Sequence, residues 1–134
     1  MSGETSIEKL LSGMRPSLNP GEYVFCTVPD LAVLQGAAPV GSFREQEGLT
    51  VILERSEAQA LGLHYDYLAA WITLTIHSSL EAVGLTAAFA TALGNAGISC
   101  NVIAAYYHDH IFVAVQDAQR AMAVLQGLAK RGGA

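Results

Sequence analysis

The feature that most constrains this chain is a long segment without basic side chains: no Lys or Arg occurs between Arg55 and Arg120. Within that segment, residues 67–116 contain two carboxylates, Glu81 and Asp109. Charged residues make up 14% of the chain, compared with about a quarter in an average globular protein, so this segment is unsuited to face water on all sides. We therefore expect its surface to be covered by other elements or by a second subunit.

Composition and charge exclude several classes of protein. Of the 134 residues, 51% are hydrophobic, enough for one compact domain or two small halves that share a core. The net charge of −5, with no basic cluster beyond Lys130 and Arg131, excludes nucleic acid as a partner. No apolar run is long enough to cross a bilayer, and residues 1–11 include Glu4 and lack the apolar core of a signal peptide. We expect no membrane partner, a cytoplasmic location, and reduced, buried cysteines at Cys26 and Cys100.

Apolar periodicity and turn residues predict the elements of the first half. Pro16 and the Asn-Pro-Gly turn at 19–21 end the first helix, and Glu47-Gly48 is typical of a hairpin. Ser56 is positioned to cap the second helix through its hydroxyl. The predicted order is a helix over Ser6–Met14, strands over Tyr23–Val28, Ser42–Glu45 and Leu49–Leu53, and a helix from Ser56 to Gly62.

The second half begins with a strictly alternating segment, Trp71–His77, which is typical of a strand with one buried face. A helix over Gly84–Asn95 follows and ends at Gly97. Strands over Ile98–Ala105 and Ile111–Val115 are joined by a predicted turn at 107–109. The last helix, capped by Asp117, buries a face made of Ala118, Ala121, Met122, Leu125 and Leu128.

Each half thus contains three strands and two helices, and the ends of the halves correspond. Residues 49–53, a strand, lead into the Ala/Gln helix at 56–60, as residues 111–115 lead into 117–121. We predict a duplicated α+β unit of the split βαβ type, with an N-terminal half over residues 1–64 and a C-terminal half over residues 65–134.

Several motifs resemble those of ACT domains. Residues 71–86, WITLTIHSSLEAVGLT, resemble the first strand, ligand loop and Gly-Leu helix start of an ACT domain, and residues 96–102, AGISCNV, are similar to its second strand. The turn Tyr-Tyr-His-Asp-His at 106–110 resembles that of small bacterial stand-alone ACT-like proteins of unknown function, and so do residues 23–29 and 47–50. The resemblance extends from about Tyr23 to Leu128.

The resemblance implies a ferredoxin-like βαββαβ fold, with two ACT-like halves in tandem. It also implies a regulatory protein that binds a small molecule, usually an amino acid, without a cofactor and as a homodimer. In this family the ligand lies in the loop between the first strand and helix, closed by the second strand of the partner. Carried over to this chain, the loop positions are Ser78, Ser79, Glu81, Val83, Gly84 and Leu85, and the facing strand positions are Cys100, Asn101, Val102 and Ile103.

The residues of the loop favour ligand binding on physical grounds as well. A helix start leaves unpaired N–H groups with partial positive charge, so a carboxylate can bind there without an Arg. Glu81 is suited to hold the ammonium group of a ligand. The alternative is structural: Ser78 and Glu81 form a capping box, and Gly84 serves close packing.

His108, Asp109 and His110 could alternatively bind a metal ion, with His77 as a further ligand, because imidazole and carboxylate groups suit Zn²⁺ or Fe²⁺. We expect instead a structural turn in which Asp109 hydrogen-bonds the backbone and Tyr106 and Tyr107 are partly buried anchors.

Three classes of function remain, and catalysis is the weakest. The pairs Ser78 with His77 and Cys100 with His108 lack a nucleophile motif, and phosphate-binding glycine loops are absent from the sequence. We expect a non-enzymatic sensor. A ligand-free module for oligomerisation or docking is the first alternative, and a metal-dependent enzyme that uses the histidine cluster is the second.

Overall fold

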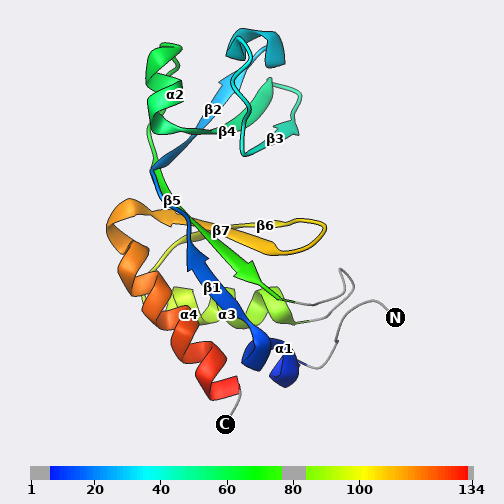
Figure 1. Ribbon diagram of the computed structural model, residues 1–134, viewed down its shortest axis with the longest axis vertical. Helices are drawn as coiled ribbons and strands as arrows, with labels where there is room; N and C mark the ends of the chain where they lie inside the picture. The colour runs from blue at the N-terminus through cyan, green and yellow to red at the C-terminus, as the bar shows by residue number, and fades with distance from the viewer. Residues whose placement is uncertain (1–6, 77–83, 133–134) are drawn as a thin grey trace. The chain divides into compact units, whose positions relative to one another are not determined.

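The computed structural model describes residues 7–76 and 84–132, and it divides the chain into two compact units. Unit 1 comprises residues 1–19 and 70–134, and unit 2 comprises residues 20–69. Figure 1 labels the elements of both units. The packing units therefore differ from the predicted halves over 1–64 and 65–134, because residues 7–18 pack with the second half. The bounds of the two predicted halves stay a prediction.

The sheet of unit 1 has the strand order β1-β5-β7-β6. These strands are β1 (Arg15–Leu18), β5 (Leu68–Thr75), β7 (Asp109–Ala114) and β6 (Cys100–Ala104). β1 pairs antiparallel to β5, with Arg15 opposite Thr75, and β6 pairs antiparallel to β7, with Cys100 opposite Val113. β6 is therefore an edge strand of this sheet.

Helices α1 (Ile7–Gly13), α3 (Leu85–Asn95) and α4 (Ala118–Gly132) lie on one side of this sheet (Figure 1). A 3-10 turn, η2 (Val115–Asp117), leads into α4. The predicted face of α4 is confirmed, since Ala121 and Leu125 are fully buried. The core of unit 1 combines all three helices with alternate residues of β5 and β7, including Leu10, Leu11, Ile72, Leu74, Phe89, Leu93, Ile111, Val113, Ala121 and Leu125.

The strand β1 was not predicted, because Pro16 indicated a break. A proline is tolerated at the edge of a sheet, where its missing N–H costs no ladder bond, and Pro16 lies opposite Leu74 in such an edge strand. β1 takes the place that the fourth strand has in a βαββαβ sheet, although it precedes the other three in the chain. The ferredoxin-like α+β fold is confirmed.

Unit 2 repeats the same arrangement on a smaller scale. Its elements are β2 (Tyr23–Val28), the 3-10 helix η1 (Leu31–Leu34), β3 (Gly41–Arg44), β4 (Leu49–Glu54) and α2 (Arg55–Ala60). β2 pairs antiparallel with β4 and also with the first two residues of β5, Leu68 and Ala69. The core comprises Val24, Cys26, Val28, Leu34, Val51, Leu53 and Ala58.

Two further predictions need correction. α2 begins at Arg55 after Glu54, and no side chain caps it, so the predicted cap at Ser56 is wrong. β5 begins at Leu68, three residues before the predicted start, because Leu68 and Ala69 pair with β2 across a long stretch of sequence. Among the described residues, no helix is both long and apolar enough to cross a membrane.

Candidate functional site

The predicted ligand loop is described only at its end. Ser78, Ser79, Glu81 and Val83 lie outside the described residues, as does His77. Helix α3 begins at Leu85, and its N-cap residue, Gly84, has no side chain that could cap the first turn. Gly84 has a φ of 89°, a left-handed conformation that favours glycine. The helix thus starts after the Ser-x-x-Glu sequence that suggested a capping box.

The predicted site residues of the facing strand, β6, lie on both faces of the sheet. Cys100 and Val102 are half-buried and pack against the core of unit 1, and Leu85 is part of that core. Asn101 and Ile103 are exposed on the opposite face, where Asn101 Nδ2 donates a long hydrogen bond to the carbonyl oxygen of Phe112, at 3.4 Å. Within one subunit, therefore, only Asn101 and Ile103 of this strand present side chains away from the helices.

Beside these residues lies a polar network that was not predicted from the sequence. Asn19 Nδ2 donates to Thr73 Oγ1, at 2.9 Å, and to the carbonyl oxygen of Trp71, at 3.1 Å. The indole N–H of Trp71 donates to His110 Nδ1, at 3.0 Å, and the Trp71 ring stacks on Phe112 with centroids 6.1 Å apart. Alternation along β5 is the signal that could have placed Trp71 and Thr73 on one face.

These contacts define the state of His110. An indole N–H can only donate, so His110 Nδ1 is the acceptor, and the neutral ring carries its proton on Nε2. Burial lowers the pKa of His110, the nearby His108 lowers it further, and Asp109 opposes both effects. At neutral pH this face therefore offers a neutral N–H donor from His110.

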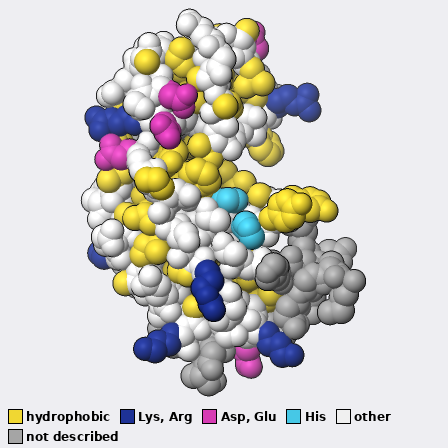
Figure 2. All heavy atoms as spheres, in the orientation of Figure 1, with side chains coloured by type: hydrophobic (Ala, Val, Ile, Leu, Met, Phe, Trp, Pro, Cys, Tyr) yellow, Lys and Arg dark blue, Asp and Glu magenta, His cyan; other side chains and the backbone are white. Residues whose placement is uncertain are grey.

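The predicted turn before β7 is present, closed by a hydrogen bond from the Ala105 N–H to the carbonyl oxygen of His108, at 3.1 Å. The hydrogen bonds of the described residues do not include the predicted one between the Asp109 side chain and the backbone. The prediction that Tyr106 and Tyr107 are partly buried anchors is wrong, because the two residues are 80% and 76% exposed. Their rings touch edge to face, with centroids 4.9 Å apart. In Figure 2, histidine side chains and hydrophobic groups both reach the surface of the face in view.

Neither metal binding nor nucleophilic catalysis gains support from the residues of this region. The described part of the chain contains no group of three or more His, Cys, Asp or Glu side chains suited to a metal ion. Burial raises the pKa of the Cys100 thiol, which is opposite to the shift that activates a nucleophile.

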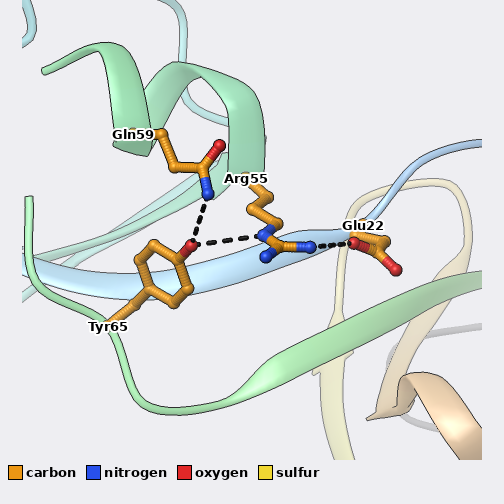
Figure 3. Close-up of polar contacts among 4 residues, drawn as sticks. All are labelled: Glu22, Arg55, Gln59 and Tyr65. Atoms are coloured by element: carbon orange, nitrogen blue, oxygen red, sulfur yellow. Dashed lines mark hydrogen bonds and ion pairs between the residues drawn. The ribbon is translucent and has the colours of Figure 1, made fainter.

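Unit 2 contains a second candidate site, a pocket of about 420 Å³ near the start of α2. Arg55 donates from Nη1 to Glu22 Oε1, at 2.9 Å, and from Nε to the Tyr65 hydroxyl, at 3.2 Å. Gln59 Nε2 donates to the same hydroxyl, at 3.1 Å (Figure 3). The pocket is lined by Gly21, Glu22, Glu54, Arg55, Ser56 and Gln59.

The charged side chains of this pocket pair with each other and remain accessible to water. The hydrogen bond to Tyr65, and then that to Glu22, raise the pKa of Arg55, which keeps its charge. The side chains of Arg55 and Glu22 are 43% and 41% exposed, so water screens their ion pair. Sequence patterns could not predict this ion pair, because Arg55 and Glu22 are 33 residues apart.

Sequence comparison now identifies the class of protein. The chain belongs to the ACT domain family: one ACT domain model matches residues 2–70, and a second matches residues 68–127. ACT domains are regulatory domains that bind small molecules, and here two of them follow each other along the chain. No curated protein matches the chain.

Solved structures agree with this assignment. A protein of unknown function from Vibrio cholerae, VC0802, described as a possible transport protein, is 54% identical, with a TM-score of 0.85 over 93% of this chain and 97% of that chain. Atu0741 from Agrobacterium tumefaciens is 16% identical, with a TM-score of 0.67 over 87% and 89%. The regulatory subunit of aspartate kinase from Thermus thermophilus is 12% identical, with a TM-score of 0.65 over 84% and 95%. The last two likenesses concern the fold alone.

Proposed function

We propose that this protein is a regulatory sensor that binds an amino acid as a homodimer in the cytoplasm. The ligand would lie at the loop before α3, formed by Ser78, Ser79, Glu81, Val83, Gly84 and Leu85. The edge strand β6 of a second subunit would close the site through Cys100, Asn101, Val102 and Ile103. Membership of the ACT domain family supports the sensing role.

The observation that supports this proposal is the start of α3, where the N-cap residue is Gly84, which has no side chain to cap the first turn. Backbone N–H groups at such a start attract a carboxylate, which matters in a segment that has no Lys or Arg. The exposed Asn101 amide can add a hydrogen bond to the ligand, since its own bond to Phe112 is long.

The edge strand supports the dimer. β6 lies at the end of the unit 1 sheet, and none of its residues, Cys100–Ala104, is charged. Proteins commonly protect exposed edges with charged side chains or proline, because unpaired N–H and C=O groups recruit another strand. A neutral edge of this kind suits pairing with the same strand of a second copy.

A docking module is the second candidate, favoured by the exposed rings of Tyr106 and Tyr107. Exposed aromatic side chains are typical of surfaces that bind other proteins. In that case the protein would bind its partner without any small molecule.

A thermal-shift screen against the twenty amino acids separates the two candidates. A ligand at about 100 times its Kd stabilises the native state by about 2.7 kcal/mol, so the melting temperature rises by several degrees. Asn101→Ala should weaken that shift, while Asn95→Ala, at the far end of α3, should leave it unchanged. The absence of any shift at millimolar concentrations contradicts the sensor and favours docking.

A further inference from the structure

Two side chains of β5 lie within hydrogen-bond distance of the same nitrogen atom of His110, on β7. The Trp71 indole N–H donates to His110 Nδ1 at 3.0 Å, and the Thr73 hydroxyl oxygen lies 3.3 Å from that nitrogen. In the neutral ring Nδ1 has one lone pair, and the indole N–H, which can only donate, occupies it at the shorter distance. The hydroxyl, in contrast, can accept as well as donate, so the two partners suit different protonation states of His110.

A proton on Nδ1 changes this nitrogen from an acceptor to a donor. The indole N–H of Trp71 then faces another N–H, and the hydrogen bond between the two rings cannot persist. The Thr73 hydroxyl oxygen can accept the new N–H instead, because it has two lone pairs and the Asn19 amide, at 2.9 Å, uses one of them. The protonated ring therefore has an alternative partner already in place.

The two partners of His110 are held in different ways. Asn19 fixes the position of Thr73: its amide donates to the Thr73 hydroxyl, and its backbone N–H donates to the carbonyl oxygen of Trp71, at 2.9 Å. The indole ring of Trp71 stacks on Phe112 and makes a tilted contact with the His110 ring, with centroids 5.8 Å apart. Loss of the N–H bond to His110 would therefore change the surroundings of the indole, while the hydroxyl stays in place.

The charged groups around His110 set the direction of its titration. Burial and the nearby His108 lower the pKa of His110 below its ordinary 6.5, and Asp109 opposes both effects. The neighbouring strands β5 and β6 carry no charged side chain, and the thiol of Cys100 packs against the core on the opposite face. Arg15, on β1, bonds to backbone carbonyl oxygens of its own segment. His110 is thus neutral at neutral pH and gains its proton in mildly acidic solution.

We propose that Trp71, Thr73 and His110 form a proton-operated switch on the sheet face of unit 1 that points away from the helices. In the neutral state, His110 Nδ1 accepts from the indole and holds it. In the protonated state, Nδ1–H donates to Thr73 and the indole N–H is released. Ile103, an exposed residue of β6, is the cross-strand partner of His110, so the switch adjoins the edge strand. The inference does not depend on the proposed function, because the switch needs neither a ligand nor a second subunit.

The test follows the indole N–H of Trp71 by NMR. Trp71 is the only tryptophan of the chain, so a ¹H–¹⁵N spectrum contains a single indole resonance. We expect this resonance to move upfield as the pH falls from about 7 to 5, with the same midpoint as the ¹⁵N shifts of the His110 ring, because release from an acceptor shields the proton. The ¹⁵N shifts should also show Nδ1 without a proton at neutral pH. All samples contain EDTA, and circular dichroism monitors folding.

Three variants separate the switch from a merely structural contact. His110→Gln should abolish the movement of the indole resonance with pH. Thr73→Val keeps the shape of the side chain but removes the second acceptor, so the midpoint should fall by about one pH unit, a tenfold weaker binding of the proton. The matched control is Thr75→Val, at the next position of β5 on the same face, which should titrate with the wild-type midpoint.

Several results would overturn the inference. One is an indole resonance that stays in place while the His110 ring gains its proton, and another is Thr73→Val with the midpoint of the wild type. A movement that coincides with unfolding, or that disappears when EDTA removes metal ions, also contradicts a switch driven by protons alone. If His110→Gln fails to fold, the wild type and Thr73→Val still decide the question, because neither measurement uses that variant.

Discussion

The two units differ in the exposure and pairing of their charged side chains. In unit 2, the Arg55 guanidinium, the Glu22 carboxylate, the Tyr65 hydroxyl and the Gln59 amide satisfy one another at a half-exposed surface. In unit 1, Asp109 is 8% exposed as a residue and has no hydrogen bond or ion pair with the described residues, in a segment without Lys or Arg. The same fold thus carries a solvated network of paired side chains in one unit and a largely buried acidic residue without such a network in the other.

This difference shows which charges are informative about function. An exposed ion pair gains little, since water screens it and two long side chains lose entropy, so it neither requires nor predicts a ligand. A largely buried carboxyl group without such a pair costs stability when it is ionised. We expect unit 1 to be the sensing unit, because the proposed ligand site before α3 belongs to it.

The largest loss of stability should come from a substitution in the core of unit 1. Phe89 on α3 is fully buried, so Phe89→Ala should lower the free energy of unfolding by about 3–5 kcal/mol. Thr91→Ala, at an exposed position of the same helix, should change it by no more than about 0.5 kcal/mol. Urea denaturation followed by circular dichroism measures both, and equal losses would show that α3 does not pack as described.

The pH dependence of stability should separate the two titrating groups of β7. The folded-state pKa of His110 lies below its ordinary 6.5, so its contribution is present above pH 6.5 and is lost as the pH falls toward the folded pKa. The folded-state pKa of Asp109 lies above its ordinary 3.8, so its contribution is present below pH 3.8 and is lost as the pH rises toward the folded pKa.

Two variants check these signs by urea denaturation across the pH range. His110→Gln should reduce the loss of stability on acidification below about pH 6.5, and Asp109→Asn should remove the gain toward pH 4, each by up to about 1.4 kcal/mol per pH unit. Parallel curves for wild type and variants would contradict the burial of both groups. Asp66→Asn, at an exposed site, is the control.

The smallest effect should come from unit 2. Glu22→Gln, which removes the charge of the Arg55 partner, should shift the melting temperature by no more than about one degree, and added salt should erase the shift. A double-mutant cycle with Arg55→Gln measures the coupling. A large, salt-resistant coupling would break the contrast between the units and make the pocket of unit 2 the stronger candidate site.

Local patterns predicted most of the strands and helices. The bounds of β2, Tyr23–Val28, agree with the prediction, and α3 begins one residue after its predicted start, because hydrophobic periodicity and glycine at the helix ends act over a few residues. β1 was missed, since its pairing partner, β5, lies more than fifty residues away in the chain, and Pro16 is acceptable only at an edge. The exposure of Tyr106 and Tyr107 likewise depends on which elements surround the turn.

The residues of the candidate site stay a prediction from the sequence, which says nothing of their arrangement. The sequence alone determined that residues 56–119 lack positive charge, that the fold is ferredoxin-like, and that recognition of a ligand carboxylate there would need backbone N–H groups. Only the tertiary structure decided that the chain start supplies the edge strand β1, that Trp71 fixes the tautomer of His110, and that Asp109 is buried. The physical reason is that burial and pairing depend on contacts between distant segments, whereas charge and periodicity are properties of the chain itself.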